Sequence, residues 1–417
     1  ITEKNATTAE LDLINATTTD GTFAQMLSNN RYSVEAAKDA NDNYTGKYKI
    51  AYSASASDVV AEAGGSQNNR AAGEAWDNVG GISGQTVAVQ TVLNNLSQHN
   101  AQGYAEALTN LAPTDTMTFV GMTQDLNNLV SDQVAARLDA QGLNSGDVFA
   151  QTSVWVQTLY NKSKQDKTSG TQGFTGKTNG IAFGFDGEVD DEVTVGAGYA
   201  YNKSDVKSLG RKTAIEGHTF FVYGKYQPSD WYMRGMINYG LAKYEEKANV
   251  AGILNKSDYD VANYGARIAF GYDMAYGFAP EAGLRLTHIE RDSYTDTVGQ
   301  QIKTDDNEIL TATAGIKYAT HITSGGFNWT PNTHVALTYD ILSDDTNAAV
   351  NIAGNVYEVN GKKLSRLGTE GGISVESSVD NWDFTLGYDF GLRSHYTSHT
   401  GSLKIKYKDF IDIGDWG

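Results

Sequence analysis

The side chains that could do chemistry are few, and their spacing fits no catalytic or metal-binding pattern. The chain has no cysteine, which excludes disulfides, thiolate zinc sites and cysteine nucleophiles. Its seven histidines are scattered, and the closest pair, His395 and His399, is spaced for a helix although the surrounding residues alternate like a strand. Residues 171–178, TQGFTGKT, lack the first glycine of a P-loop, and no G-x-S-x-G serine motif occurs. We therefore expect no metal and no cofactor.

A second group of ionisable side chains occupies regular positions in the C-terminal part of the chain. From about residue 148 onward, apolar residues alternate with Gly, Ala, Thr and charged residues. If the polar row lined a water-filled space, its basic and acidic members would form a charge lattice that stiffens the wall. In the simpler alternative they only hydrate a pore. The expected pore-lining residues are Arg234, Arg267, Glu281, Arg285, Lys317, Glu370, Glu376, Asp383 and Asp389.

The alternation predicts long β-strands. Tyr264, Phe270 and Tyr272 belong to one apolar row, and Gly265 and Arg267 to the row opposite. Alternating runs of about ten residues with aromatics at the ends of the apolar row are typical of membrane β-barrels. A soluble sandwich also alternates, but its strands average about 5–6 residues and its inner row is branched aliphatic. The sequence therefore favours an all-β fold, an antiparallel transmembrane barrel in which tyrosines form girdles at the membrane surfaces.

The alternating runs number twelve, an even number as expected of a bacterial outer-membrane chain. A barrel of this size falls between filled eight-stranded barrels and open sixteen-stranded pores, so its lumen has room for one helix about 10–12 Å across. The predicted strand centres lie near residues 153, 182, 198, 221, 236, 267, 285, 314, 337, 372, 387 and 405.

A polar helix is predicted just before the barrel, at residues 114–140. It opens with Thr and Asp, which are common N-cap residues, and it contains no proline. At 1.5 Å per residue it would extend about 40 Å, which exceeds the roughly 30 Å hydrocarbon layer. Its surface is too polar to face lipid. We expect this helix to run through the barrel lumen; the alternative is that it lies outside, on the periplasmic face.

The first part of the chain differs in composition. Residues 1–64 contain short alternating runs separated by Asn, Thr, Asp and Gly, which we interpret as a short N-terminal β-helix remnant. Residues 65–145 have the apolar spacing of helices. The net charge of −18 argues against nucleic acid as a partner, because phosphates would be repelled. No apolar run is long enough for a transmembrane helix.

Four segments carry a resemblance to a known family. They are QNNRAAGEAWD (67–77), YAEALTNLAP (104–113), SDQVAARLD (131–139) and GDVFAQTSVWVQTLY (146–160). In this order, and leading into a barrel, they resemble the translocator end of classical monomeric autotransporters (type V secretion). The resemblance implies three parts. These are the C-terminal end of a passenger at 1–64, a helical linker at 65–145 with 114–140 as the pore helix, and an outer-membrane barrel at 146–417.

The resemblance also implies a function and its partners. Such a unit brings its own N-terminal passenger to the surface of a Gram-negative bacterium without ATP. Its expected partners are outer-membrane lipid, the barrel-assembly machinery and periplasmic chaperones, and the barrel is expected to be a monomer in the bacterial outer membrane. Two other classes stay open. One is an outer-membrane porin or channel with an internal plug helix, and the other is a barrel enzyme with an acid–base cluster at its outer rim.

The end of the chain resembles the family's assembly signal in altered form. Family barrels end on an aromatic residue with apolar residues at alternate positions before it. Leu403, Ile405 and Tyr407 alternate in this way. The chain then continues, so that Phe410 falls out of register with Tyr407 and is not terminal. The resemblance assigns the assembly signal to these four residues.

Asn127 and Asn128 are the one pair for which the resemblance implies bond cleavage. Some autotransporters cut themselves inside the barrel at such a pair, where the side-chain amide of the first Asn attacks its own backbone carbonyl. The simpler interpretation is two amides on a helix surface, and the chain is otherwise expected not to be an enzyme. Cleavage predicts a fragment beginning near Asn128, which N-terminal sequencing would detect, and its loss in an Asn127→Ala variant. A fragment that persists in that variant excludes this chemistry.

Overall fold

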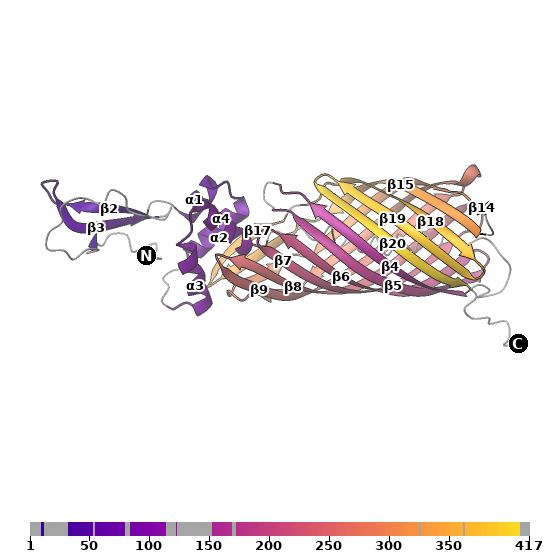
Figure 1. The fold of residues 1–417 in the computed structure, drawn as a ribbon, viewed down its shortest axis with the longest axis horizontal. Coiled ribbons are helices and arrows are strands. Elements are labelled where there is room, and N and C mark those ends of the chain that lie inside the picture. The colour runs from indigo at the N-terminus through magenta and orange to yellow at the C-terminus, as the bar shows by residue number, and fades with distance from the viewer. Residues whose placement is uncertain are drawn as a thin grey trace.

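A mostly helical N-terminal part is followed by a large β-barrel (Figure 1). The computed structural model describes residues 10–11, 32–52, 55–79, 84–113, 122, 152–168, 172–324, 327–361 and 363–408. Among the helices in these ranges, none is both long and apolar enough to cross a membrane.

Twelve long antiparallel strands form a closed barrel, which confirms the predicted fold class. Each strand pairs with the next, β10 pairs with β13, β13 with β15 and β15 with β18, and the pairing of β20 with β4 closes the wall. Every predicted strand centre lies within a different one of these strands. They are β4 Thr152–Gln165, β5 Phe174–Asp190, β6 Val193–Ser208, β7 Arg211–Tyr226, β8 Trp231–Val250, β9 Ile253–Tyr272, β10 Phe278–Arg291, β13 Asn307–Ala319, β15 Phe327–Ser343, β18 Leu367–Val379, β19 Trp382–Arg393 and β20 Tyr396–Lys408.

The apolar rows face outward and the polar rows face the lumen. On β8, Ile237 and Leu241 are exposed on the outer surface, whereas Tyr232, Arg234 and Glu246 are buried inside. This is the reverse of a soluble protein, and it is stable only if lipid surrounds the wall. Exposed aromatics mark both edges of the apolar band. They are Trp231, Tyr272, Phe278, Trp329 and Trp382 at one edge and Tyr160, Tyr239, Tyr264, Tyr339 and Tyr388 at the other.

The two ends of the barrel differ. One end has tight turns, the short helix η1 Ala275–Gly277 and the short strand β14 Ile322–Ser324. The other end, which we call the outer mouth, carries a separate sheet of short strands. Because outer-membrane barrels have short periplasmic turns and longer extracellular loops, the outer mouth faces the cell exterior. The strands of this sheet are β11 Tyr294–Thr295, β12 Gln301–Thr304, β16 Asn347–Ile352 and β17 Asn355–Asn360.

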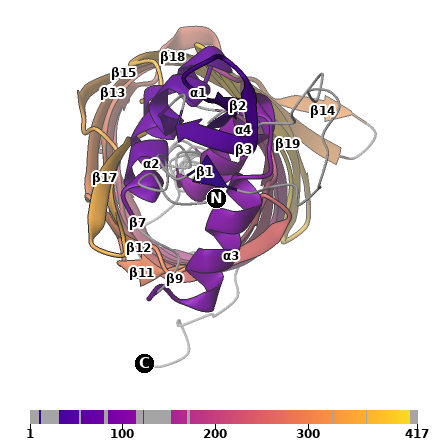
Figure 2. The same ribbon diagram turned by 90° about the vertical axis from the view of Figure 1, so that its left-hand side faces the viewer.

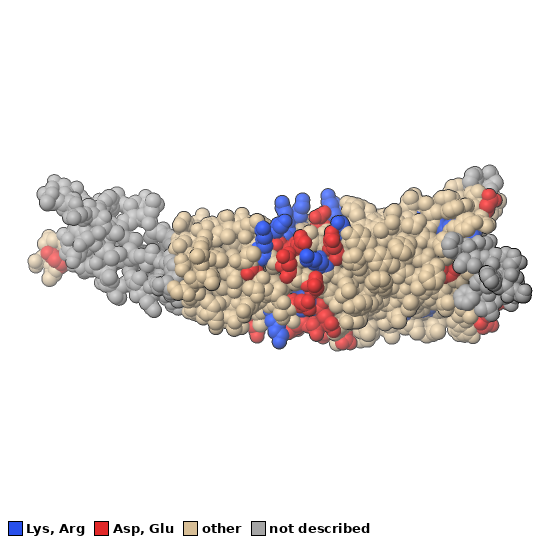
Figure 3. Space-filling model, turned by 90° about the horizontal axis from the view of Figure 1, so that it is seen from below, with Lys and Arg blue, Asp and Glu red and all other residues tan. Residues whose placement is uncertain are grey.

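Near the outer mouth the two faces of the wall exchange character. On β8 the outward row changes from Leu241 to Lys243, while the inward row ends in the buried apolar residues Ala248 and Val250. β8 and β9 each have 20 residues, about twice the predicted length, because only part of each strand lies in the membrane. On the face that Figure 3 draws, the resulting band of charged side chains crosses the wall between the apolar region and the helical end. The outer third of the barrel therefore behaves like a soluble β-protein.

The helical part lies at the outer mouth (Figures 1 and 2). Each helix is preceded by an N-cap residue whose side chain accepts a hydrogen bond from the first turn, and these residues are Ser55, Ser66, Thr86 and Asn100. Helical structure begins at Ala56, earlier than the expected boundary near residue 65, and α4 ends two residues before Pro113. The four helices, which we call the helical cap, are α1 Ala56–Glu62, α2 Gln67–Asp77, α3 Val87–Leu96 and α4 Ala101–Leu111. Before them, β1 Glu10–Leu11, β2 Tyr32–Lys38 and β3 Tyr44–Tyr52 form a small sheet in the order β1-β3-β2.

The inverted wall predicts how a new charge will act at two positions of one strand. Val222 and Ala214 both point outward from β7, the first within the apolar band and the second beyond it. Val222→Arg should lower the free energy of unfolding by about 2–4 kcal/mol, because arginine is costly at the bilayer midplane. Ala214→Arg should change it by less than about 0.5 kcal/mol. Denaturant unfolding in lipid vesicles measures both, and equal losses would contradict the assigned membrane position.

Candidate functional site: the barrel lumen and the outer mouth

The lumen carries a network of ion pairs centred on Glu281 of β10. Its carboxylate accepts from Arg234 Nη2 at 2.5 Å and from the Tyr232 hydroxyl at 3.0 Å, and Lys317 Nζ lies 2.9 Å away. The three partners come from β8 and β13, so Glu281 ties together strands on both sides of its own. A carboxylate with three hydrogen-bonding partners is held in place even where water is present.

Arg285, also on β10, reaches farther along the wall. Both of its terminal nitrogens donate to Glu370 of β18 in a bidentate ion pair, one of them at 2.7 Å. Two strands, β13 and β15, lie between them, and both present a small residue to the lumen. Gly315 of β13 is the cross-strand partner of Glu281, and Ala336 of β15 is the partner of Glu370. Small side chains there leave room for the guanidinium to span the gap. The pair therefore braces a stretch of wall that is four strands wide.

The remaining pore-lining residues also lie on inward-facing rows. Asp383 is 2.9 Å from Lys408 Nζ and 3.5 Å from Lys406 Nζ, two partners that the sequence did not single out. Glu376 accepts from Thr385 at 3.1 Å. Asp389 lies 3.9 Å from His334, and Arg267 lines the same lumenal cavity of about 440 Å³ as Glu281, Glu370, Glu376 and Asp389. All nine expected residues thus share one polar lumen.

An aromatic layer on the inner wall was not predicted. Trp155, Phe221 and Tyr223 lie flat against the strands over glycines, and Gly196 and Gly198 leave no room for a Cβ beneath the two rings that cover them. The Trp155 indole donates to the Tyr223 hydroxyl at 3.0 Å, and that hydroxyl donates to Asp186 at 2.7 Å. Glycines two residues apart on a strand were the available signal. Because the rings lie flat, they thicken the wall without filling the pore.

At the outer mouth the lumen becomes apolar and receives the helical cap. Buried residues of α1–α4, including Val60, Trp76, Val92 and Leu108, belong to one core with inward-facing residues of the strands. The barrel contributes Val206, Ile215, Tyr244, Tyr259, Val261 and Ile289, and the mouth sheet contributes Tyr294, Ile302, Val350, Ile352, Tyr357 and Val359. The cap is therefore packed into the mouth like part of a folded domain.

Gln300 joins the cap to the mouth sheet. Its side-chain oxygen accepts from the Trp76 indole at 3.2 Å and from the Tyr357 hydroxyl at 2.7 Å. Its side-chain nitrogen donates to the backbone carbonyl of Leu111 at 3.0 Å and to Asp296 at 2.8 Å. One fully buried amide thus makes four hydrogen bonds, two of them to the cap. Such a network holds its partners in one arrangement, because each unpaired group would be costly.

Arg211 at the start of β7 holds the end of α4. It forms a buried ion pair with Glu246 of β8, and it donates to the backbone carbonyls of Asn110 at 2.9 Å and Ala112 at 3.3 Å. Glu246 also accepts from the Tyr259 hydroxyl at 2.6 Å. The last carbonyls of a helix lack partners within the helix and carry partial negative charge, so a guanidinium there is doubly favourable.

Three asparagines complete the docking. Asn68 donates to the backbone carbonyl of Asn360 at 2.8 Å and accepts from its amide at 3.0 Å, which continues the edge pairing of β17. Asn95 and Asn110 donate at 3.0 and 2.8 Å to backbone carbonyls in and beside the β8–β9 turn. Asn68 and Asn110 are buried although helix surfaces seldom bury amides. Their roles show why α2 and α4 carry them.

Burial also acts on the acid beside Gln300. It raises the pKa of the Asp296 carboxyl above its ordinary value of 3.8, although hydrogen bonds from Gln300 and Asn255 oppose the shift. A raised pKa means that ionisation opposes folding. The contribution of this carboxyl to stability is therefore greatest below its ordinary pKa and falls as pH rises through the raised value.

Comparison with known proteins identifies the barrel. A model of the autotransporter β-domain matches residues 154–389. The chain belongs to the autotransporter β-domain family. The translocator domain of autotransporter NalP from Neisseria meningitidis has the same fold, with a TM-score of 0.55 at 15% identity over 68% of this chain and 97% of that one.

Two relatives of this autotransporter barrel are much longer proteins. Outer membrane protein B of Rickettsia prowazekii is 24% identical over 373 residues, which is 76% of this chain and 23% of that protein. Outer membrane protein A of Rickettsia conorii is 23% identical over 353 residues, 75% of this chain and 18% of that protein. The chain thus spans less than a quarter of the length of these relatives. The family assignment confirms the outer-membrane location and favours an export barrel over a channel.

Several predicted features of the autotransporter lie outside the described residues. They include Asn127, Asn128 and Phe410, and the pore helix 114–140 except for Met122. Met122 is buried, and its sulfur packs against Gly176 on the inward row of β5. Self-cleavage at the Asn pair stays a prediction.

The other three expected assembly-signal residues lie on the last strand. Leu403, Ile405 and Tyr407 form the outward row of β20, where Tyr407 packs against Trp382 with ring centres 4.8 Å apart. They therefore face lipid next to the seam where β20 pairs with β4.

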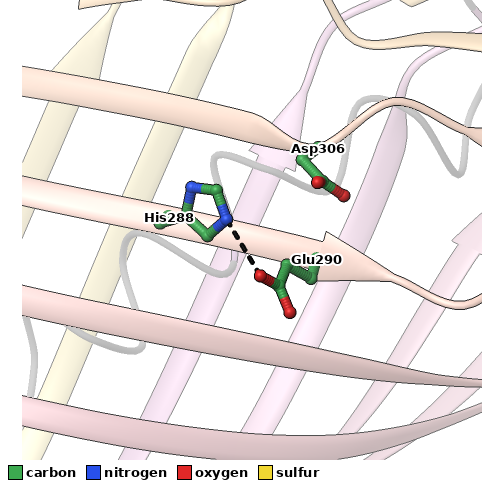
Figure 4. Close-up of side chains that lie close together, drawn as sticks. All are labelled: His288, Glu290 and Asp306. Carbon is green, nitrogen blue, oxygen red and sulfur yellow. Dashed lines mark hydrogen bonds and ion pairs between the residues drawn. The ribbon is translucent and has the colours of Figure 1, made fainter.

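A cluster at the outer rim was missed from the sequence. His288 Nε2 lies 3.2 Å from a Glu290 oxygen, and ligand atoms of His288, Glu290 and Asp306 all lie within 4.8 Å of one another (Figure 4). Residues two apart on a strand share a face, which was the available signal for the first two. Asp306 comes from the turn before β13, which only the fold could place beside them. An imidazole and two carboxylates suit a divalent metal, but the carboxylates are exposed.

The bidentate pair in the lumen predicts a measurable coupling. Arg285→Met leaves Glu370 without its partner and should cost about 1–3 kcal/mol of unfolding free energy, less than in a dry core because Glu370 is partly exposed. Adding Glu370→Gln should recover part of the loss. Denaturant unfolding of both single variants and the double variant gives the coupling energy. Strictly additive losses would show that the pair does not brace the wall.

Proposed function

We propose that the barrel exports the chain that precedes it and then keeps that chain at the cell surface, with the helical cap closing the outer mouth. The observation that supports this most directly is the position of two points in the chain. Ala112 is held by Arg211 at the outer mouth, whereas Thr152 pairs with Gly187 near the short turns of the opposite end. The segment between them must connect the two ends of the barrel. Met122, packed on the inner wall, supports a path through the lumen.

In this proposal the cap is a stopper that forms after export. Its apolar face packs on an apolar mouth, the end of α4 is held by Arg211, and Asn95 and Asn110 donate to backbone carbonyls in and beside the β8–β9 turn. The apolar faces, Arg211 and the asparagines would all be exposed to water while a passenger still occupied the mouth. Docking releases that water and supplies the hydrophobic free energy that makes the last step hard to reverse.

We further propose that the barrel works as a monomer, since its wall is closed by its own first and last strands. Insertion would depend on the general assembly machinery of the outer membrane and on periplasmic chaperones. The outward row of β20, with Leu403, Ile405 and Tyr407, would be presented to that machinery before β20 pairs with β4, because this edge is open until the barrel closes.

The stopper role predicts the effect of two adjacent substitutions on conductance. Arg211→Met removes the inward-facing group that holds α4, whereas Lys212→Met changes the charge equally on the outward face of the same strand. In planar bilayers the first variant should open more often and conduct more than the parent protein, and the second should match the parent.

The cap can be followed separately from the barrel. Limited proteolysis between α3 and α4 should be faster in Arg211→Met, while the barrel keeps its heat-dependent gel mobility. Arg211→Met combined with Glu246→Gln controls for the carboxylate that would otherwise be left buried. Unchanged conductance and proteolysis in Arg211→Met and in the Arg211→Met, Glu246→Gln double variant would overturn the stopper role.

A further inference from the structure

A row of four lysines runs across the outside of the barrel beyond the membrane. Lys207 of β6 is the cross-strand partner of Lys212 on β7, Lys212 pairs in register with Lys247 of β8, and Lys247 with Lys256 of β9. All four are exposed, and we call them the lysine row. Like charges directly opposite one another on neighbouring strands repel and destabilise a sheet. Four in succession are unexpected in a chain whose net charge is −18.

The neighbouring charges show that the row differs from ordinary surface residues. Other outward-facing lysines, which lie closer to the membrane on β6 and β8, are paired with acidic residues of the protein. Lys203 lies 2.6 Å from Glu216, and Lys243 lies 3.7 Å from Glu245. No member of the lysine row forms an ion pair with a residue that the structure describes. Ion pairs with the described residues therefore do not relieve the repulsion among the four lysines, and an external anion would relieve it.

The next strand of the wall, β10, which pairs with β9, has the reverse sign. On and beside β10, exposed acidic residues beyond the aromatic edge include Glu290, Asp292, Asp305 and Asp306. The outer surface is thus basic along the lysine row and acidic beside it at β10, and the band in Figure 3, which holds both colours, lies beyond the apolar wall. An anionic partner would be attracted by the lysine row and repelled beside it, at β10.

The height of the row selects among the anions that surround an outer-membrane barrel. With a rise of ~3.3 Å per residue and a strand tilt of ~40°, Lys247 stands about 15 Å farther out than Leu241, the last apolar residue of its outward row. Phospholipid headgroups fill only about 5–8 Å outside the hydrocarbon layer. The lysine row lies beyond them, at a height that the larger head of a glycolipid can reach.

We propose that the lysine row binds phosphate groups on the saccharide head of an outer-leaflet glycolipid. Ammonium groups recognise phosphate as point charges, and four on a line about 5 Å apart from strand to strand suit a chain of phosphates carried on sugars. Asp205, Glu245 and Asp258 lie on the outer surface, each two residues closer to the membrane than a member of the lysine row. Their negative charges keep such anions from binding closer to the membrane.

The experiment compares two matched double variants of the full chain in phospholipid nanodiscs. Lys212→Gln with Lys247→Gln removes the centre of the lysine row. Lys203→Gln with Lys243→Gln removes the same charge from the same face, but from lysines that are ion-paired. Binding of purified phosphorylated lipopolysaccharide is measured by native mass spectrometry and by the shift in the thermal unfolding midpoint. The first variant should bind about tenfold more weakly than the parent, and the second within about twofold of it.

Three further arms separate the sources of phosphate. Lipopolysaccharide stripped of phosphate, phosphatidylglycerol in the nanodisc and free inorganic phosphate should each fail to distinguish the parent from the first variant. The heat-dependent gel mobility of each variant reports that the barrel is folded. The proposal is overturned if both double variants lose affinity equally, if neither does, if dephosphorylated lipopolysaccharide binds the parent as tightly, or if phosphatidylglycerol reproduces the difference between variants.

Discussion

The structure depends on one constraint, which is that lipid offers no hydrogen bonds to a peptide backbone. Every amide and carbonyl in the membrane must therefore be paired within the chain, and for strands this requires a wall without edges. The pairing of β20 with β4 meets the requirement. Once the wall is closed, successive side chains must point alternately to lipid and to the lumen. The rows of aromatic, apolar and charged residues are consequences of that geometry.

The same strands obey the opposite rule a few residues farther out. Beyond Leu241 the environment outside the wall is water, so Lys243 and Glu245 point outward and the inward row becomes apolar. This exchange of faces creates the mouth into which the helical cap packs. A barrel whose lumen stayed polar to its rim would have no apolar surface to offer the cap. The position of the membrane edge on each strand thus decides where the cap can bind.

The sequence predicted the parts of the fold that rest on periodicity. Alternation located all twelve strands, and it placed Arg234 and Glu281 toward the lumen because the alternate rows of the same strands are mostly apolar. It did not reveal which charges pair, since Arg285 reaches Glu370 across two intervening strands. It also placed the helical segment only as a linker. The contacts of Trp76, Gln300 and Arg211 join residues far apart in the chain, and no local pattern encodes them. The length of β8 was underestimated because the exchange of faces interrupts the apolar row.

The attachment of α4 to Arg211 also decides how the molecule bears tension. The small sheet of β2 and β3 precedes the cap in the chain, and Met122 follows it on the inner wall. A pull on the exterior part of the chain therefore reaches the cap before it reaches anything inside the barrel. There the load divides among Asn68 on β17, Trp76 on Gln300 and α4 on Arg211, and from these it passes into several strands at once. The wall carries the strain, and Met122 on the inner wall is spared.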